Sequence, residues 1–210
     1  MTSSDPAEAT PSAPRRRTLT KRRIVSEAMG LIAEEGIEVL TMRRLGGSLG
    51  VDAAALYRHF PDKAALLRAI GRAAIAEVDV PASAEEMSWE AWVLRTRTDY
   101  CGVLAERPYV VPLILDGLIP WQGLPAYAIE RRLMLREGFA EQDVHSVIEV
   151  LEAFVVGWVA VVDAVSRSPR AAAARGYGSS AEVPTDFERG LRALLGGLRA
   201  EFIGAGAGAG

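Results

Sequence analysis

The chain has 210 residues, of which 50% are hydrophobic and 24% are charged. This size and composition allow one or two domains with a hydrophobic core, and they exclude a fully disordered or collagen-like chain. The single cysteine, Cys101, cannot form an internal disulfide. The longest strongly apolar stretch, residues 153–162, is too short to span a membrane, and no apolar run near the N-terminus is typical of a signal peptide. We therefore expect a cytoplasmic protein with no membrane partner.

Basic residues are concentrated in the first third of the chain, although the net charge is −3. Residues 15–72 hold twelve basic and six acidic side chains, whereas residues 73–210 hold twelve basic and nineteen acidic ones. A basic segment joined to an acidic body favours a polyanionic partner for the first segment alone. Ordinary scatter of charge is the alternative explanation.

Apolar residues recur with helical spacing along most of the chain, and almost no stretch alternates as a β-strand does. Between residues 18 and 80 the start and stop signals predict four helices, two of them short. Thr41, Asp52 and Asp62 are suitable N-cap residues, and Gly36 and Gly50 are suitable helix ends.

The remainder of the chain also has helical patterns, interrupted by prolines between residues 108 and 125. The fourth of the helices predicted above covers residues 62–78. The next helix runs from the start signals at 83–88 through 104, and three more are expected at residues 126–136, 143–166 and 185–202. We expect disorder at residues 1–17 and 204–210, and a long mobile loop at 166–184. The predicted fold class is all-α. A three-helix helix-turn-helix DNA-binding lobe (18–65) precedes a larger helical ligand-binding and dimerisation lobe (66–203).

The two short helices between residues 41 and 60 have the proportions of a helix-turn-helix motif. In such a motif the second helix enters the DNA major groove, while the first crosses the backbone. Gly50 permits the tight turn, and five apolar residues can form the small core of the motif: Leu45, Leu49, Val51, Leu56 and Phe60. On the outer side, Tyr57 can donate a hydrogen bond to a phosphate, and Arg43 and Lys63 can neutralise backbone charge.

Residues 40–67, LTMRRLGGSLGVDAAALYRHFPDKAALL, resemble the DNA-binding domain of the TetR family of bacterial transcriptional regulators. The similarity extends over residues 20–78, and the Leu-Tyr-Arg-His-Phe-x-x-Lys segment is its most specific part. Residues 136–159 and 187–198 are more weakly similar to the C-terminal ligand domain of the tetracycline-repressor branch. The resemblance implies a homodimer that binds a palindromic operator and releases it when a small molecule binds.

The resemblance also assigns roles to individual positions. The positions at which the family contacts bases are occupied here by three alanines, residues 53–55, which offer only apolar contact to a thymine methyl. Our hypothesis is that Arg43, Arg44 or Arg58 discriminates bases instead, since a guanidinium can bind guanine bidentately. The predicted DNA-binding residues are Thr41, Arg43, Arg44, Ala53, Ala54, Ala55, Tyr57, Arg58, His59 and Lys63. The basic residues at 15–17 and 21–23 form either an arm that reaches the minor groove or a solvated tail.

Most of the large aromatic side chains of the second lobe are expected in its core, and some in an apolar pocket beside the proline-broken segment 109–125. The candidate pocket residues are Trp89, Trp92, Tyr100, Trp121, Tyr127, Met134, Phe154 and Trp158. The tetracycline-repressor branch is known for a magnesium–tetracycline site with a histidine. Because the only histidines here are His59 and His145, and His59 lies in the DNA-binding lobe, we expect a different small apolar or aromatic effector and no metal or cofactor.

The helix expected at 143–166 is too apolar on all sides for the surface of a monomer. Together with the last helix it could build a four-helix dimer interface, and burial within one subunit is the alternative. The candidate interface residues are Gly157, Val161, Ala164, Leu191, Leu194 and Leu198.

An α-helical enzyme, or a small-molecule-binding protein whose basic lobe binds polyanions non-specifically, is the competing interpretation. His145, Glu149 and Glu152 share one helix face, which suggests metal binding. The sequence has no Glu-x-x-His pair, phosphate loop, nucleophile elbow or zinc spacing, however. We therefore expect a ligand-responsive repressor rather than an enzyme. The sequence does not distinguish it from an activator.

Overall fold

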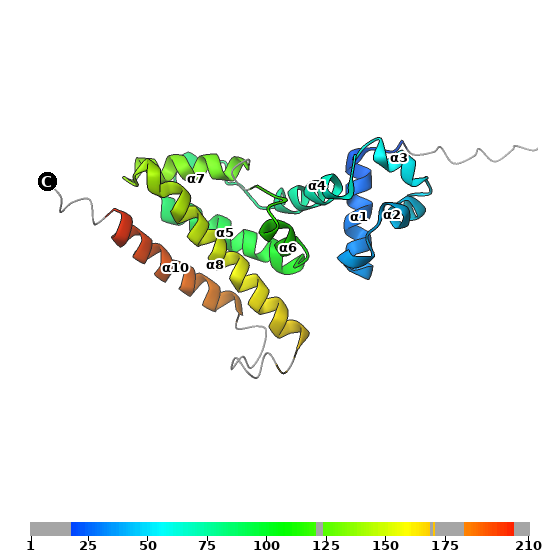
Figure 1. Ribbon diagram of the computed structural model, residues 1–210. Coiled ribbons are helices and arrows are strands. Elements are labelled where there is room, and N and C mark those ends of the chain that lie inside the picture. Colours follow the sequence, from blue (N-terminus) through cyan, green and yellow to red (C-terminus); the bar gives the residue numbers. More distant parts are fainter. Residues whose placement is uncertain (1–17, 121–123, 169, 171–182, 204–210) are drawn as a thin grey trace, which may run out of the picture.

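Helices account for all the regular secondary structure in the computed structural model, which describes residues 18–120, 124–168, 170 and 183–203. This confirms the predicted all-α class. The helices form two groups with separate hydrophobic cores, and α4 (Lys63–Ile75) leads from one group to the other (Figure 1). The ends predicted to be disordered, residues 1–17 and 204–210, lie outside the described residues, as does most of the predicted loop at 166–184.

The first group is a small bundle around the helix-turn-helix motif. It consists of α1 (Lys21–Glu35), the 3-10 helix η1 (Ile37–Val39), α2 (Met42–Leu49), α3 (Ala53–Tyr57) and the first half of α4. Its fully enclosed side chains come from every α-helix of the group, and they include Ile24, Leu45, Leu56, Leu66 and Ile70. The apolar periodicity of the sequence therefore predicted both the helices and the faces that they bury.

Two of the three predicted N-caps act through their side chains. The Thr41 hydroxyl accepts a hydrogen bond from the backbone N–H of Arg44 at 3.0 Å, and the Asp62 carboxylate accepts one from Ala65 at 2.6 Å. Each bond satisfies a donor that the first turn of a helix leaves open. Asp52 does precede α3, but its side chain makes no capping hydrogen bond. The predicted position of the Asp52 cap is therefore correct, but the predicted side-chain capping is not.

The turn between α2 and α3 depends on two glycines. Gly50 adopts the left-handed conformation with φ of 68°, which favours glycine. Gly46 lies where the chain folds back on itself, and its carbonyl accepts a hydrogen bond from Val51 N–H at 2.9 Å. A Cβ at Gly46 would lie 2.8 Å from the backbone oxygen of Val51. A side chain at that position would push the two motif helices apart.

Helix α4 is shorter than predicted. It ends at Ile75, and two turn hydrogen bonds, Glu77 N–H to Ala74 O and Val78 N–H to Ile75 O, take the place of the expected last turn. The helix contributes Leu66 and Ile70 to the first core and Ala74 to the second. It is thus a structural part of both groups.

The second group consists of η2 (Ala84–Glu86), α5 (Trp89–Glu106), α6 (Val110–Leu115), α7 (Pro125–Arg136), α8 (Glu141–Arg167) and α10 (Val183–Phe202). Helices α8 and α10 run side by side along one edge of the molecule, and both pack against α5 (Figure 1). Helix α8 starts at Glu141 and α10 starts at Val183, so each starts two residues before its predicted position. No helix in the described part of the chain is both long and apolar enough to cross a membrane.

Arg199 ties the last helix to the rest of the second group. Its guanidinium lies 2.7 Å from a carboxylate oxygen of Glu137, at the end of α7, and 3.1 Å from one of Glu90 in α5. The other oxygen of Glu137 accepts a hydrogen bond from the backbone N–H of Trp89 at 2.6 Å. Three helices therefore meet at one small polar network above the apolar core.

Adjacent glycines of α2 provide a matched test of the helix-turn-helix turn. We expect Gly46→Ala to lower the free energy of unfolding by about 1–3 kcal/mol, because its methyl group meets backbone rather than a movable side chain. Gly47→Ala, whose methyl group meets nothing within 4 Å, should stabilise the protein by about 0.5–1 kcal/mol. Urea denaturation followed by circular dichroism measures both values. Equal effects of the two substitutions would contradict the close approach at Gly46.

Candidate functional site

The predicted DNA-binding residues lie on α2 and α3, with Thr41 at the N-cap of α2, Arg58 and His59 directly after α3, and Lys63 at the start of α4. Seven of them are exposed, and the other three are half-buried. The exposed ones are Thr41, Arg43, Arg44, Ala54, Tyr57, Arg58 and Lys63, and the half-buried ones are Ala53, Ala55 and His59. The alanines of α3 therefore present little more than methyl groups, and the charged side chains stand around them.

Tyr57 is notable on this surface because an aromatic ring is left outside the core. It lies at the end of α3 and is 51% exposed. Its hydroxyl makes no hydrogen bond with any described residue. An amphipathic ring at the rim of a basic surface is suited to contact a phosphate with its hydroxyl. The exposure favours the DNA-contact interpretation over a half-buried structural role.

Arg44 is held by an intramolecular ion pair. Its guanidinium bonds the Glu35 carboxylate at the end of α1 through two nitrogens, with Nε 3.3 Å from Oε2. The hydrogen bond and the charge of Glu35 raise the pKa of Arg44. To reach a base, Arg44 must give up this pair, whereas Arg43 and Arg58 have no ion pair among the described residues. The hypothesis of base reading by arginine therefore narrows to Arg43 and Arg58.

Only some of the basic residues considered for an N-terminal arm lie in the described part of the chain. Residues 21–23 form the first turn of α1, and the Lys21 amine lies 5.8 Å from the centre of the Phe60 ring. These side chains therefore belong to the body of the first group. Residues 15–17 lie outside the described part of the chain.

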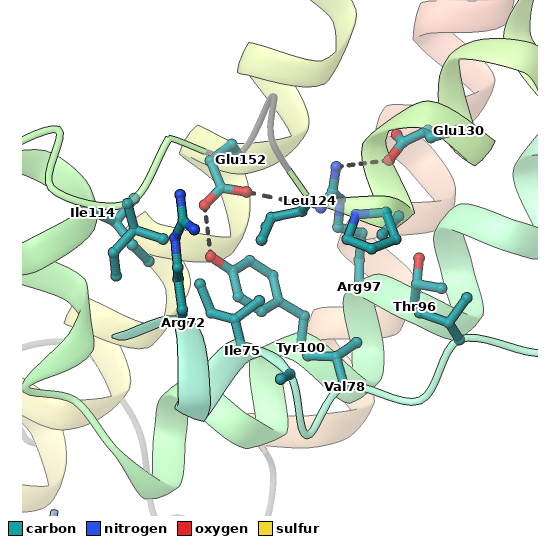
Figure 2. Close-up of a pocket in the computed structure, with 15 residues that line it drawn as sticks. Arg72, Ile75, Val78, Thr96, Arg97, Tyr100, Ile114, Leu124, Glu130 and Glu152 are labelled. Atoms are coloured by element: carbon teal, nitrogen blue, oxygen red, sulfur yellow. Dashed lines mark hydrogen bonds and ion pairs between the residues drawn. The ribbon is translucent and has the colours of Figure 1, made fainter. Parts of the chain in front are cut away.

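A cavity of about 260 Å³ lies in the second group, next to the end of α4 (Figure 2). Helices α4 to α8 and the segments between them contribute to its wall. Most of the lining is apolar, including Ile75, Val78, Val80, Ile114, Ile119 and Leu124. Its volume is near the lower end of the range for small-molecule sites, about 300–1,000 Å³.

One side of the cavity carries a buried charged cluster. The Arg97 guanidinium, whose side chain is 13% exposed, lies 2.9 Å from Glu130 Oε2 and 3.8 Å from Glu152 Oε2. The Tyr100 hydroxyl donates a hydrogen bond to Glu152 Oε1 at 2.8 Å (Figure 2). Two carboxylates therefore share one guanidinium.

Burial dominates the electrostatics of this cluster. It raises the pKa of Glu130 above the ordinary value for glutamate, and Arg97 opposes that rise while the charge of Glu152 adds to it. Burial and the neighbouring Glu152 likewise raise the pKa of Tyr100, so its hydroxyl keeps its proton and remains a donor. The cavity thus combines apolar walls with a buried cluster of two carboxylates, one guanidinium and one hydroxyl.

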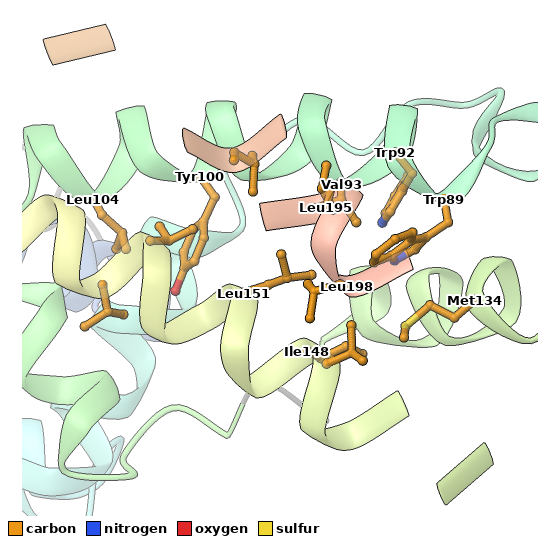
Figure 3. Packing of buried hydrophobic residues seen from close by; sticks show 14 of the residues in the cluster. Trp89, Trp92, Val93, Tyr100, Leu104, Met134, Ile148, Leu151, Leu195 and Leu198 are labelled. Carbon is orange, nitrogen blue, oxygen red and sulfur yellow. The ribbon is translucent and has the colours of Figure 1, made fainter. Parts of the chain in front are cut away.

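Few of the aromatic residues predicted for the pocket line this cavity. Tyr100 does, and Tyr127 lines an adjoining cavity of about 30 Å³. Trp89, Trp92 and Met134 are fully buried in the hydrophobic core instead (Figure 3). They pack there because their positions fall on the inner faces of α5 and α7, away from the cavity.

Two other predicted pocket residues form an aromatic cluster between α8 and α10. The ring centre of Phe187 lies 5.4 Å from that of Phe154 and 5.7 Å from that of Trp158. These rings hold the two helices together rather than line the cavity. The remaining candidate, Trp121, lies outside the described residues.

Sequence reasoning did not place Arg97 and Glu130 in a pocket. A weak signal was present, since Glu130 precedes Leu133 and Met134 by three and four residues and so stands on a buried helix face. Glu152 was noted with His145 and Glu149 as a possible metal face. In the structure His145 and Glu149 are exposed, while Glu152 points inward, so the three do not act together. The described residues contain no metal-binding cluster of histidine, cysteine and acidic side chains.

The outer face of α8 and α10 is built of small residues. Along α8 it presents Val150, Ala153, Gly157 and Ala160, and along α10 it presents Ala193, Gly196, Gly197 and Ala200, all of them exposed. Of the predicted interface residues, Gly157 is exposed and Val161, Ala164 and Leu194 are half-buried near this face, whereas Leu191 and Leu198 are buried inside the subunit. A Cβ at Gly157, Gly196 or Gly197 would meet nothing within 4 Å, so the packing of the subunit does not require these glycines.

Residues 24–70 match the sequence model of the bacterial regulatory proteins of the tetR family. The tetracycline repressor protein class A from transposon 1721 of Escherichia coli is 29% identical over 196 residues, which cover 83% of this chain and 88% of the repressor. The matched segment contains α2, α3 and most of α1 and α4, which is the whole helix-turn-helix core. The first group of helices thus matches the tetR-family DNA-binding domain, and most of the chain is similar to a tetracycline repressor.

Solved structures show the same fold. BioQ bound to its natural double-stranded DNA operator superposes with a TM-score of 0.67 at 24% identity, over 87% of this chain and 99% of BioQ. The TetR-family protein ActR of Streptomyces coelicolor, in complex with (S)-DNPA, gives a TM-score of 0.65 at 20% identity, over 89% of this chain and all of ActR. The relatives in sequence are transcriptional repressors, which favours a regulator over the competing interpretation as a helical enzyme.

The Arg44–Glu35 pair predicts that Arg43, Arg44 and Arg58 differ in their effect on DNA binding. We expect Arg43→Ala and Arg58→Ala each to weaken operator binding about 10-fold or more. If the substituted arginine contacts a base, the affinity for random DNA should fall less than the affinity for the operator. Arg44→Ala should change the preference for operator over random DNA by less than about 3-fold, since its guanidinium bonds Glu35. Fluorescence anisotropy with both DNAs at two salt concentrations measures this. A selective loss of operator binding in Arg44→Ala would show that the pair opens on DNA.

Proposed function

We propose that this protein is a TetR-family repressor that binds a palindromic operator as a homodimer and releases it when a small apolar or aromatic effector occupies the cavity. In this proposal residues 18–65 bind DNA, and residues 66–203 bind the effector and form the dimer. The observation that carries the proposal is the position of α4, which belongs to the core of the helix-turn-helix group and also forms part of the cavity wall.

The surface of the first group supports DNA as the partner. Three exposed cationic side chains, Arg43, Arg58 and Lys63, surround the short helix α3, and none has an ion pair among the described residues. Charges that a fold leaves without partners on a helix-turn-helix surface are suited to phosphate binding. The structure of BioQ with its operator, which has the same fold, is in accord with this role.

The outer face of α8 and α10 supports the homodimer. Glycine within a helix costs about 1 kcal/mol relative to alanine, and the subunit itself does not need the glycines at 157, 196 and 197. Small residues on two adjacent helices let a second pair of helices approach closely. A second copy of the same face would form a four-helix contact with two-fold symmetry, which matches the symmetry of a palindrome.

The contact between Gly71 and Ile119 supports coupling of the cavity to DNA binding. Gly71 is buried in the middle of α4, and a Cβ there would lie 2.0 Å from Cδ1 of Ile119. Ile119 also lines the cavity. A ligand that displaces Ile119 therefore presses on α4, and α4 holds the helix-turn-helix group through Leu66 and Ile70. In thermodynamic terms, the effector must bind better to the arrangement that is incompetent for DNA.

The proposed function predicts that a pool of random DNA duplexes, bound to the protein, recovered and sequenced, yields one palindromic sequence. The half-sites should lie about one helical turn, or a multiple of it, apart. Fluorescence anisotropy at two salt concentrations then gives the affinities for operator and random DNA. Weak, strongly salt-dependent binding without any enriched sequence would contradict a sequence-specific regulator, because it is typical of a generic polyanion binder.

Disruption of the outer face of α8 should abolish both the dimer and operator binding. We expect Gly157→Arg to be monomeric by light scattering and to lose about 10-fold or more in operator affinity, because one half-site alone contributes only part of the binding energy. The matched control is Gly30→Arg on the exposed side of α1, where a Cβ likewise meets nothing within 4 Å. It should remain dimeric. A Gly157→Arg protein that is still a dimer would place the interface elsewhere.

Gly71→Ala tests the link between cavity and DNA. The added methyl group must displace Ile119 or α4, so we expect operator affinity to fall roughly 3- to 30-fold, the range for couplings of 0.5–2 kcal/mol. None of the predicted DNA-binding residues is altered by this change. The additional substitution Ile119→Ala, which makes room for the methyl group, should restore affinity. If Gly71→Ala binds operator as the wild type does, the contact does not transmit the signal.

A further inference from the structure

One carboxylate oxygen in the cavity wall lacks a partner. Glu130 is 2% exposed, and its Oε2 is bonded to Arg97, but its Oε1 is buried with no hydrogen-bond donor in reach among the described residues. A buried oxygen of an ionised group without a donor is costly to the folded protein. Glu130 lines both the main cavity and the small one beside it.

The charges around this oxygen favour a cation. Glu130 and Glu152 together carry two negative charges when ionised, and Arg97 supplies one positive charge to both. The Tyr100 hydroxyl adds a donor but no charge. Arg72, which also lines the cavity, is exposed to solvent, where its charge is screened. The buried cluster therefore has one more carboxylate than guanidinium.

An anionic ligand is the obvious alternative, because Arg97 Nε also lacks a partner. An anion placed there would become the third negative charge around a single buried guanidinium, and like charges at such distances repel strongly in a site of low polarity. A neutral donor would satisfy Glu130 Oε1 but leave the excess charge in place. A cation supplies both the donor and the charge that the ionised cluster lacks.

The remaining walls determine the other half of the ligand. Ile75, Val78, Ile114, Ile119 and Leu124 bring apolar side chains from α4, α6 and the neighbouring segments to the cavity (Figure 2). Burial of an apolar ligand body against these side chains provides affinity, while the charged cluster at one side fixes its orientation. Polar ligands such as sugars would leave many hydrogen bonds unmade there.

We propose that the cavity binds a lipophilic amine, whose protonated nitrogen donates a hydrogen bond to Glu130 and whose apolar body packs against the isoleucine and valine side chains opposite. Burial raises the pKa of Glu130 in the free protein, and an adjacent ammonium group offsets that burial by stabilising the ionised carboxylate. This inference rests on the proposed function, since it names the chemical class of the effector.

Three probes of similar size that share a naphthyl group test the charge preference: naphthylmethylamine, naphthylmethanol and naphthoate. Isothermal titration calorimetry on the full-length protein should show that the amine binds about 10-fold or more tightly than the alcohol, because a hydrogen bond between two charged groups is among the strongest. The carboxylate should bind most weakly. This comparison uses the wild-type protein alone, so it does not depend on whether any variant folds.

Two variants assign the preference to Glu130. Glu130→Gln should reduce amine binding about 10-fold and leave binding of the alcohol nearly unchanged, whereas Glu141→Gln, which alters an exposed carboxylate paired with Arg131, should change neither. Ala126→Leu, which fills part of the cavity, should weaken the amine and the alcohol alike. Melting temperatures without probe establish that each variant is folded.

Operator release is measured separately, by anisotropy with the selected operator. Preferential amine binding that Glu130→Gln abolishes supports the ligand class, whether or not DNA is released. A lack of release would contradict the proposed function and leave the ligand class standing. Equal binding of amine and alcohol, a preference for naphthoate, or no binding of any probe would overturn the lipophilic amine and leave the repressor function to be judged by its own tests.

Discussion

The close contact of α4 with the segment that follows α6 is the constraint on which the rest of the structure depends. Gly71 is the residue that makes the contact possible, because any side chain there would occupy the space of Ile119. The same helix carries Leu66 and Ile70 into the core of the helix-turn-helix group. A bundle of this small size cannot move independently of a helix that supplies part of its core. The proposed coupling of the cavity to DNA binding rests on this continuity from the cavity wall through α4 to the helix-turn-helix group.

The cavity combines apolar walls with a buried charged cluster, and each affects the other. Apolar walls lower the polarity of the site, which strengthens every electrostatic interaction within it and makes the unpaired oxygen of Glu130 costly. The charged cluster in turn limits which apolar molecules are tolerated. Arg44 and Glu35 show the opposite situation on the surface of the first group, where an exposed ion pair contributes little to stability but changes which arginine is available to DNA.

The α8–α10 face shows how a local sequence signal was seen but assigned to neighbouring residues. Gly157 was a candidate interface residue, and it lies on the exposed stripe of α8 together with Ala153 and Ala160. On α10 the leucines were expected at the interface, yet Leu191 and Leu198 pack inside the subunit, and Ala193, Gly196, Gly197 and Ala200 occupy the outer face. Large apolar residues are drawn first to the core of the subunit, so small ones remain for a surface that a second copy could cover.

The sequence by itself determined the all-α class, the positions of most helices, the caps at Thr41 and Asp62, and the helix-turn-helix motif with its resemblance to the tetR family. These features depend on residues close together in the chain, and helical periodicity and turn chemistry act over that range. The tertiary structure alone decided that Trp89, Trp92 and Met134 belong to the core, and that Arg97, Glu130 and Glu152 meet at the cavity. Those residues come from three helices, and nothing in the local sequence states which helix faces will meet. The registers and angles at which α5, α7 and α8 pack bring the three charges together, because packing depends on the complementary shapes of whole helix surfaces.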